Sequence, residues 1–228
     1  MLISKLKEMD IKDQSILEAF DTIPRHYFLD LVFDAQAYKN MAFQIGSDQT
    51  ISHPYTVAFQ TQLLEVEKGM KILEIGTGSG FQTCILCRLG AKVFSIERHK
   101  ELHKKAKGMI DFFKFSARLF FGDGYKGNKT YAPYDRILVT CGAPKLPVEL
   151  LSQLKNGGVL VIPIGAGKEQ KMIKLTKPPR SVAAFKASLT TLLSELVYRL
   201  TSYFSLVNAF TLAIPVRASS KIELEVAM

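Results

Sequence analysis

Short apolar runs alternate with amphipathic segments along the middle of this chain. Six runs have the length and apolar character of buried strands, and most of the segments between them carry apolar residues at helical spacing. The predicted strands are residues 71–75, 92–96, 118–121, 135–140, 159–164 and 170–176. The predicted helices are residues 56–64, 81–89, 99–109 and 147–154. This alternation predicts an α/β fold with a doubly wound sheet and helices on both faces.

The two ends of the chain differ from this pattern. Residues 2–20 predict one or two amphipathic helices, and residues 25–34 predict another short helix. Residues 37–52 show no sustained periodicity, so we predict a loop, and a loop of this length inside a compact domain tends to carry function. Beyond residue 176 the helix and strand signals conflict, and residues 183–214 receive no assignment.

A glycine-rich turn follows the first predicted strand. Gly76, Gly78 and Gly80 separate this strand from a predicted helix, and Glu97 ends the next strand about twenty residues later. Strand, glycine turn, helix and strand with a terminal acid form the layout of a nucleoside-binding unit, in which the carboxylate accepts hydrogen bonds from both ribose hydroxyls. The alternative is a glycine turn that only packs a helix on a sheet.

The glycine spacing narrows the choice of nucleoside. The pattern is G-x-G-x-G, whereas dinucleotide sites use G-x-G-x-x-G. Glu74 stands two residues before Gly76, and an anionic strand end suits an ammonium group better than a pyrophosphate. S-adenosylmethionine carries an α-ammonium, a sulfonium and a ribose. The local chemistry therefore favours S-adenosylmethionine over NAD.

Three segments are expected to meet at the carboxyl edge of the sheet, where open α/β sheets bind ligands. The first is the glycine turn, and the second is Glu97. The third is Asp123, which follows the next strand and precedes Gly124. Asp123 is suited to accept a hydrogen bond from an adenine amino group, and the alternative is that it caps a turn. The predicted cofactor-binding residues are Glu74, Gly76, Thr77, Gly78, Ser79, Gly80, Glu97, Asp123 and Gly124.

Composition and charge restrict the partners. The chain has 228 residues and a net charge of +9, which fits one domain with appendages. Its basic residues are scattered, and one lysine cluster at residues 100–107 lies on a predicted helix without interleaved aromatic residues. A solvated helix face is the better interpretation, so we predict no nucleic-acid partner.

The cysteines indicate neither a metal site nor a disulfide framework. The chain has three, with Cys84 and Cys87 inside one predicted helix and no second pair to complete a zinc site. Buried thiols in a reducing compartment explain them. The N-terminus shows no charged-then-apolar leader, and residues 200–214 are too short for a membrane span. We therefore expect a monomer in the cytoplasm, without a metal or a membrane partner.

Several stretches resemble the protein-L-isoaspartate O-methyltransferases, over about residues 15–176. The stretches that are specific to this family are Ile-Pro-Arg-His-Tyr-Phe at 23–28 and Gln-Thr-Ile-Ser-His-Pro-Tyr at 49–55. The glycine and aspartate motifs, at residues 73–83 and 122–125, are shared by many methyltransferases. Residues 132–135 and 143–165 also match the family.

The resemblance implies a Rossmann-like fold and a repair reaction. A methyl group moves from S-adenosylmethionine to the carboxylate of an isoaspartyl residue in a damaged protein or peptide, and S-adenosylhomocysteine is the product. The resemblance places the catalytic role on Ser52 and substrate binding on Thr50, Ile51 and Ser52. It divides the chain into a helical cap with a substrate loop (1–52), a cofactor-binding domain (53–176) and an atypical C-terminal segment (177–228).

The chemistry places few demands on the protein. A carboxylate with a pKa near ~4 is ionised at neutral pH and needs no general base. Opposite charges are annihilated as the carboxylate meets the sulfonium, so excluding water and aligning the groups favour transfer. Ser52 can serve as a hydrogen-bond donor that orients the carboxylate, aided by free N–H groups of the following helix. The alternative is a plain helix N-cap.

Two departures from the family pattern matter. Asp48 occupies a position that is usually glycine in the family. The family's C-terminal strand, with a Phe-Val-Pro-Leu-like segment, is not found, which suggests a shifted reading frame or a replaced tail after residue 176. The alternatives are therefore a non-catalytic S-adenosylmethionine-binding paralogue, a methyltransferase of the same fold acting on RNA or a small molecule, and a NAD-dependent dehydrogenase.

Overall fold

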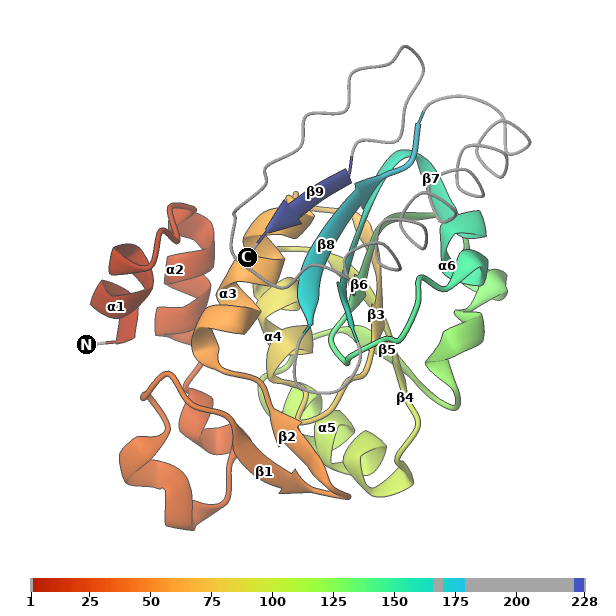
Figure 1. The fold of residues 1–228 in the computed structure, drawn as a ribbon. Helices are drawn as coiled ribbons and strands as arrows, with labels where there is room; N and C mark the ends of the chain where they lie inside the picture. Colours follow the sequence, from red (N-terminus) through yellow and green to blue (C-terminus); the bar gives the residue numbers. More distant parts are fainter. Residues whose placement is uncertain (1, 166–169, 179–223, 228) are drawn as a thin grey trace, which may run out of the picture.

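A mostly parallel sheet forms the centre of the protein (Figure 1). The computed structural model describes residues 2–165, 170–178 and 224–227. Within them, seven strands lie in the order β5-β4-β3-β6-β7-β8-β9. The first five of these are mutually parallel, whereas β8 and β9 run antiparallel to their neighbours. Their bounds are β3 Lys71–Ile75, β4 Lys92–Glu97, β5 Ala117–Phe121, β6 Tyr134–Val139, β7 Leu154–Ile164, β8 Lys171–Thr176 and β9 Leu224–Ala227.

Helices cover both faces of this sheet, which confirms the predicted doubly wound α/β class. The helices beyond residue 53 are α3 Pro54–Leu64, α4 Phe81–Arg88, α5 Lys100–Phe112 and α6 Val148–Ser152, with short 3₁₀ turns η3 Gly124–Lys126 and η4 Lys129–Tyr131. Side chains alternate along β3, so Ile72 packs with Leu64 of α3 and Leu86 of α4. Leu73 points to the opposite face and packs with Leu150 of α6.

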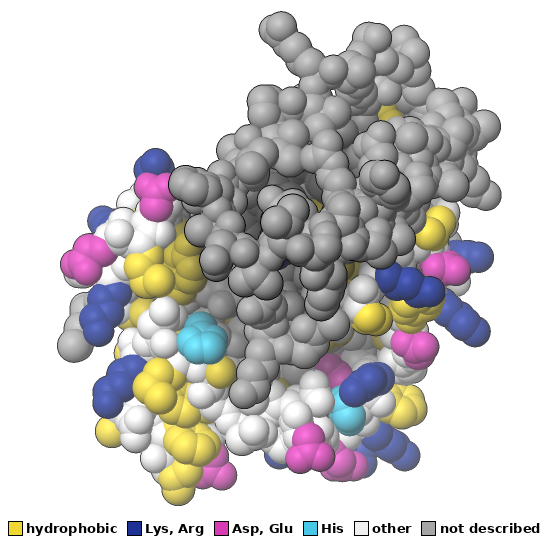
Figure 2. Space-filling model, in the orientation of Figure 1, with side chains coloured by type: hydrophobic (Ala, Val, Ile, Leu, Met, Phe, Trp, Pro, Cys, Tyr) yellow, Lys and Arg dark blue, Asp and Glu magenta, His cyan; other side chains and the backbone are white. Residues whose placement is uncertain are grey.

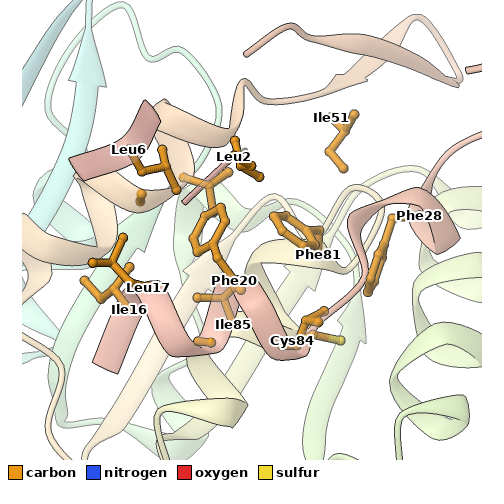
Figure 3. Packing of buried hydrophobic residues seen from close by; sticks show 14 of the residues in the cluster. Leu2, Leu6, Ile16, Leu17, Phe20, Phe28, Ile51, Phe81, Cys84 and Ile85 are labelled. Atoms are coloured by element: carbon orange, nitrogen blue, oxygen red, sulfur yellow. The ribbon is translucent and has the colours of Figure 1, made fainter. Parts of the chain in front are cut away.

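The N-terminal segment packs against the helix that follows the glycine turn. It contains α1 Leu2–Glu8, α2 Gln14–Thr22, η1 Arg25–Phe28 and η2 Leu31–Gln36. Asp13 caps α2 by accepting hydrogen bonds from two backbone N–H groups. Phe20 and Phe28 both meet the ring of Phe81 edge-on, at centroid distances of 5.5 and 5.2 Å (Figure 3). The apolar face predicted for residues 2–20 is thereby buried on α3 and α4.

The predicted loop at residues 37–52 is wrong in one respect, because it contains a β-hairpin. Strands β1 Phe43–Gly46 and β2 Gln49–Ile51 pair antiparallel around a turn at Ser47 and Asp48. Strands this short offer no measurable periodicity, which is why the pattern missed them. Ile45 lies 3.6 Å from the place where Gly78 would carry a Cβ, so the hairpin covers the glycine turn.

The hairpin turn explains how Asp48 replaces the family's glycine. Ser47 and Asp48 both have φ of +54°, the backbone of a type I′ turn, which glycine occupies without steric cost. We expect Asp48→Gly to raise the free energy of unfolding by roughly 0.5–1 kcal/mol. Urea unfolding measures it, with Asp48→Ala as a control that keeps a Cβ and should destabilise. An Asp48→Gly protein no more stable than the wild type would contradict this.

The segment after β6 differs from the prediction of a helix over 147–154 with a stop at the following glycines. Helix α6 ends at Ser152, and β7 already begins at Leu154 and includes Gly157 and Gly158. Gly157 N–H donates to the carbonyl of Lys177 at 2.7 Å, and Lys177 N–H donates to Gly158 at 2.8 Å. This long-range pairing extends the strand, and a local pattern contains no sign of it.

The C-terminal expectations fall mostly on residues that the structure does not describe. Residues 183–214, which received no assignment, lie outside the described part, and so do all of residues 180–220, whose packing would test the replaced-tail hypothesis. Strand β9 pairs antiparallel with β8 at the edge of the sheet. No helix among the described residues is long and apolar enough to cross a bilayer.

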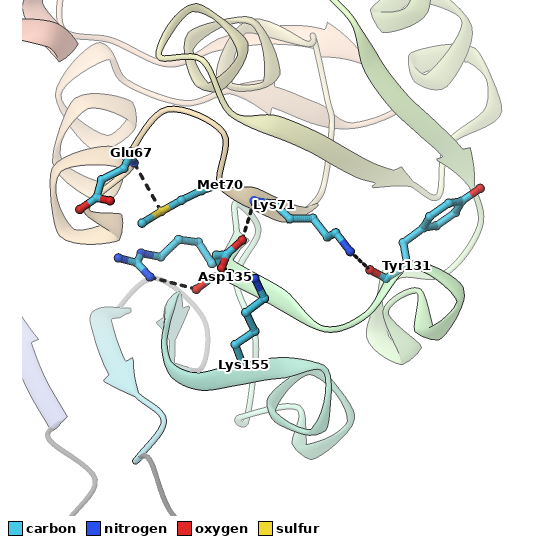
Figure 4. Close-up of polar contacts among 7 residues, drawn as sticks. Glu67, Met70, Lys71, Tyr131, Asp135 and Lys155 are labelled. Carbon is cyan, nitrogen blue, oxygen red and sulfur yellow. Dashed lines mark hydrogen bonds and ion pairs between the residues drawn. The ribbon is translucent and has the colours of Figure 1, made fainter.

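Two of the family-like stretches, residues 132–135 and 143–165, contribute polar contacts at the amino-terminal ends of the parallel strands. The Asp135 carboxylate accepts hydrogen bonds from Lys71 N–H at 2.8 Å and from Lys155 Nζ at 2.6 Å, and Lys71 Nζ donates to the carbonyl of Tyr131 (Figure 4). Burial alone would raise the pKa of Asp135, but these two donors outweigh it and lower the pKa. This cluster joins the starts of β3 and β6, so it supports the sheet away from the carboxyl edge.

Candidate active site

A pocket lies at the carboxyl ends of β3, β4 and β6, where the order of strands reverses. Its volume is about 540 Å³ including the open mouth. It brings the predicted substrate loop and the glycine turn together, although they are far apart in the sequence. The lining residues are Gln49, Thr50, Ile51, Ser52, Val57, Gln60, Gly76, Thr77, Gly78, Ser79, Phe81, Gln82, Glu97, Thr140 and Cys141.

The first glycine of the turn is required by close packing. Gly76 has φ of +94°, and a Cβ at this position would lie 2.6 Å from Thr140 Oγ1. Thr140 Oγ1 donates to the Gly76 carbonyl at 2.6 Å, which fixes the end of β6 against the turn. The backbone of the turn therefore faces the pocket with no side chain at Gly76 in the way.

Glu97 lies at the pocket and holds the glycine turn in place. Its side chain is 4 % exposed, and its two oxygens accept hydrogen bonds from Gly78 N–H and His99 N–H, each at 2.8 Å. A carboxylate has about four acceptor positions, so Glu97 keeps capacity for further donors. A pair of vicinal hydroxyls, such as those of a ribose, matches that capacity.

Glu74 is placed differently from the other predicted cofactor residues. Alternation along β3 turns it to the face that α4 covers, where it is fully buried and accepts a hydrogen bond from Thr83 Oγ1 at 2.5 Å. It is not among the pocket-lining residues, and its Oε1 has no hydrogen-bond partner among the described residues. Burial raises the pKa of Glu74 to about 7, although hydrogen bonds from Ser95 and Thr83 oppose the rise.

Three more predicted cofactor residues stand outside the pocket lining, namely Gly80, Asp123 and Gly124. Gly80 precedes α4, with φ of +86°. Asp123 is exposed and accepts a hydrogen bond from Tyr125 N–H at 2.9 Å, so the turn-capping alternative describes its contact here. Gly124 packs so closely on Ile75 that a Cβ would overlap it. The adenine contact of Asp123 stays a prediction.

Ser52 stands between β2 and α3 and lines the pocket. The N-cap of α3 is His53, not Ser52, and the His53 side chain makes no capping hydrogen bond. Among the described residues no hydrogen bond engages the Ser52 hydroxyl, which leaves it available as a donor. The adjacent first turn of α3 begins with Pro54, a residue suited to the first helical position.

The sequence reasoning missed Arg25 as a site residue. Arg25 is 1 % exposed, and its guanidinium donates to the carbonyls of Ala37 at 3.1 Å, Met41 at 3.3 Å and Ser52 at 2.8 Å. It also lies over the ring of Phe81, 5.2 Å from the centroid. Burial lowers the pKa of Arg25 to about 10. A single arginine within the aromatic stretch at 23–28 was the available signal.

Gln60 and Gln82 were also missed. Both line the pocket and are nearly inaccessible to solvent. No sequence signal distinguishes them, because glutamine on an amphipathic helix usually faces solvent.

Comparison with known proteins identifies the family. A family model described as Protein-L-isoaspartate(D-aspartate) O-methyltransferase matches residues 1–197. A protein-L-isoaspartate O-methyltransferase of Christiangramia forsetii is 54% identical over 177 residues, which cover 77% of this chain and 83% of the relative. The protein of the same name from Salinibacter ruber is 45% identical over 184 residues, covering 77% of this chain and 80% of the relative.

Solved structures agree with this assignment. A structure named protein-L-isoaspartate O-methyltransferase shares 29% identity at a TM-score of 0.69, and the match covers 78% of this chain but 59% of that one. A putative protein-L-isoaspartate O-methyltransferase of Plasmodium falciparum, solved in complex with S-adenosyl-L-homocysteine, has the same fold, with 24% identity, a TM-score of 0.67 and coverage of 77% and 88%. The chain therefore belongs to the protein-L-isoaspartate(D-aspartate) O-methyltransferase family, as the resemblance indicated.

Proposed function

We propose that this protein transfers a methyl group from S-adenosylmethionine to the carboxylate of L-isoaspartyl residues in damaged proteins and peptides. The observation that carries the proposal is the pocket itself, which Ser52 of the substrate loop lines together with the glycine turn and Glu97. A donor for a carboxylate and an acceptor for a ribose thus share one cavity. Membership of the family supports the same reaction.

The residues at the pocket fit S-adenosylmethionine. Glu97 has acceptor capacity left for ribose hydroxyls after binding Gly78 and His99. The glycine turn offers backbone that a ligand can approach closely. When bound, S-adenosylmethionine supplies an electrophilic methyl group on a sulfonium, and the leaving group is a neutral thioether.

The protein's own contribution is alignment and exclusion of water. The Ser52 hydroxyl donates a hydrogen bond to one oxygen of the substrate carboxylate and so orients the other toward the methyl group. Because that carboxylate is ionised at neutral pH, no side chain has to remove a proton. The hairpin over the glycine turn limits water around the charges, which favours a reaction that annihilates them.

The proposal includes the class of substrate, the oligomeric state and the cellular compartment. Figure 2 shows Lys and Arg side chains singly or in small groups at both sides of the face drawn. The basic residues are also scattered along the sequence, which supports a protein or peptide substrate over a nucleic acid. We further propose that the protein acts as a cytoplasmic monomer, with the residue ranges 1–52, 53–176 and 177–228 as cap, cofactor domain and atypical tail.

A second candidate is a paralogue that binds S-adenosylmethionine without turnover. The family model matches as far as residue 197, and the family's Phe-Val-Pro-Leu-like segment is not found in the sequence. The lack of this segment favours the paralogue, because the segment resembles a lid over the isoaspartyl site. A single assay separates the two candidates. Labelled methyl is followed from S-adenosylmethionine to an isoaspartyl peptide and to its normal aspartyl twin. Base-labile label on the isoaspartyl peptide alone supports repair, whereas cofactor binding without label supports the paralogue.

Ser52→Ala tests the assigned role of the serine. Loss of one hydrogen bond to a charged group is expected to lower kcat about 10- to 100-fold while the affinity for S-adenosylhomocysteine is unchanged. Steady-state methylation and calorimetric titration measure the two quantities. Ser116→Ala, at an exposed serine outside the pocket, is the matched control. Full activity in Ser52→Ala would remove Ser52 from the mechanism.

A further inference from the structure

A buried relay of polar side chains ends at the pocket. Thr61 Oγ1 lies 2.6 Å from the Val57 carbonyl, Gln82 Nε2 lies 3.0 Å from Thr61 Oγ1, and Gln60 Nε2 lies 2.6 Å from Gln82 Oε1. Gln60, Thr61 and Gln82 are 2 %, 0 % and 6 % exposed. In this environment every polar atom needs its partner, so the relay is strongly specified.

The hydrogen bonds of this relay can run in one direction only. A carbonyl only accepts, so the Thr61 hydroxyl must donate its proton to Val57. The Thr61 oxygen then has to accept, which requires the amino group of Gln82 to face it. The carbonyl of Gln82 consequently faces Gln60, and the amino group of Gln60 must point toward it. Gln60 Oε1 is thereby left as the end of the relay, with a fixed orientation.

This end of the relay is an unused acceptor at the pocket. Gln60 and Gln82 both line the pocket beside Ser52 and the glycine turn. No described residue donates a hydrogen bond to Gln60 Oε1. Ser52 offers a hydrogen-bond donor to the pocket, whereas Gln60 offers an acceptor. An acceptor of this kind selects a ligand group that carries N–H or O–H.

The position of Glu74 indicates which ligand group this is. An α-ammonium has three donors and no acceptor, and the sequence offered Glu74 as its partner. The structure buries Glu74 beneath the turn, where it pairs with Thr83 and does not line the pocket. Another acceptor beside the glycine turn is therefore needed, because Glu97, which accepts a hydrogen bond from Gly78 N–H, already suits the ribose.

We propose that Gln60 Oε1 binds the α-ammonium of the methionine end of S-adenosylmethionine, held in place by Gln82 and Thr61. The inference rests on the proposed function, because it assumes that cofactor.

The test compares two nucleosides in calorimetric titrations of the full chain. S-adenosylhomocysteine carries the amino-acid end, whereas methylthioadenosine lacks it. Gln60→Met is expected to weaken S-adenosylhomocysteine about 10- to 100-fold and to leave methylthioadenosine unchanged, because one hydrogen bond to a charged group is lost. Gln36→Met, at an exposed glutamine outside the pocket, should change neither affinity.

Several results would overturn the inference. Equal weakening of both nucleosides would show a general structural role for Gln60. An unchanged affinity for S-adenosylhomocysteine, with a raised KM for the isoaspartyl peptide, would assign the acceptor to the peptide. If Gln60→Met does not fold, Gln60→Asn, which withdraws the same amide by one methylene, must give the same selective loss. Because binding is measured without turnover, failure of methyl transfer alone would count against the proposed function and not against Gln60.

Discussion

Arg25→Met is expected to lower the free energy of unfolding by about 2–3 kcal/mol. It should also lower kcat for methyl transfer at temperatures where the variant is still fully folded. The carbonyls of Ala37, Met41 and Ser52 would each lose a donor, the first in a buried hydrogen bond and the other two in part-buried ones. An unsatisfied buried group costs roughly 1–3 kcal/mol, and removing a cation that burial disfavours offsets part of the sum.

The effect on activity follows from what Arg25 connects. Its guanidinium joins the Ser52 carbonyl to the segment around Met41 and lies over Phe81, which lines the pocket. Without Arg25, the Ser52 hydroxyl is no longer held at one distance from the glycine turn. A displacement of about 1 Å between reacting groups can lower a rate about 100-fold, so kcat should fall about 10- to 100-fold. The affinity for S-adenosylhomocysteine should change much less.

Urea unfolding and steady-state methylation at a temperature where both proteins are folded measure these effects. Arg88→Met, at the exposed last residue of α4, is the matched control. Arg25→Lys keeps the charge but cannot reach three carbonyls with a rigid planar fork, so it should recover little of either property. If Arg25→Met keeps its stability within about 0.5 kcal/mol and retains kcat, the positioning role of Arg25 is wrong.

Glu74→Gln is expected to change the pH dependence of stability. Burial raises the pKa of Glu74 from 4.5 in the unfolded chain to about 7 in the folded protein, with Ser95 and Thr83 lowering it and Glu97 raising it. Below pH 4.5 the side chain is neutral in both states and makes no difference. Between pH 4.5 and 7 it ionises only in the unfolded state, so the wild type loses stability as the pH rises.

Above pH 7 the penalty reaches its full size, about 3 kcal/mol from the shift of the pKa. Glutamine does not titrate and keeps an acceptor for Thr83. The stability of Glu74→Gln relative to the wild type should therefore improve by about 3 kcal/mol between pH 4 and pH 8. Urea unfolding of both proteins without cofactor at the two pH values tests this, with the exposed Glu67→Gln as control. A constant difference between wild type and variant would show that Glu74 ionises equally in both states.

Much of the fold follows from local patterns. The apolar runs at β3, β4, β6 and β7 are long enough to predict buried strands instead of exposed loops. Gly76 and Gly78 have positive φ, which few other residues adopt, so they predict the turn after β3. The same patterns place the Thr50–Ser52 segment and Glu97 near the ends of elements. Because the carboxyl ends of parallel strands share one edge, the sequence also predicts that the glycine turn and Glu97 meet.

Local patterns did not predict two features of the fold, one because its strands are very short and the other because it depends on a long-range contact. The hairpin of β1 and β2 was missed because three or four residues show no period, and the start of β7 was missed because its glycines pair with Lys177. These elements form through contacts between residues far apart in the chain, whose energy exceeds local preference.

The sequence by itself determined the fold class, the family and the residues that carry recognisable motifs. Tertiary structure alone decided which polar side chains reach the pocket. Glu74 stands in the glycine motif, yet the alternation of β3 turns it under α4. Gln60 belongs to no motif but lines the pocket. Arg25 lies in the family-like stretch at 23–28, but only the structure shows that it binds the Ser52 carbonyl. The reason is that a motif fixes the backbone locally, while the direction and the partners of a buried polar group depend on the elements that pack around it.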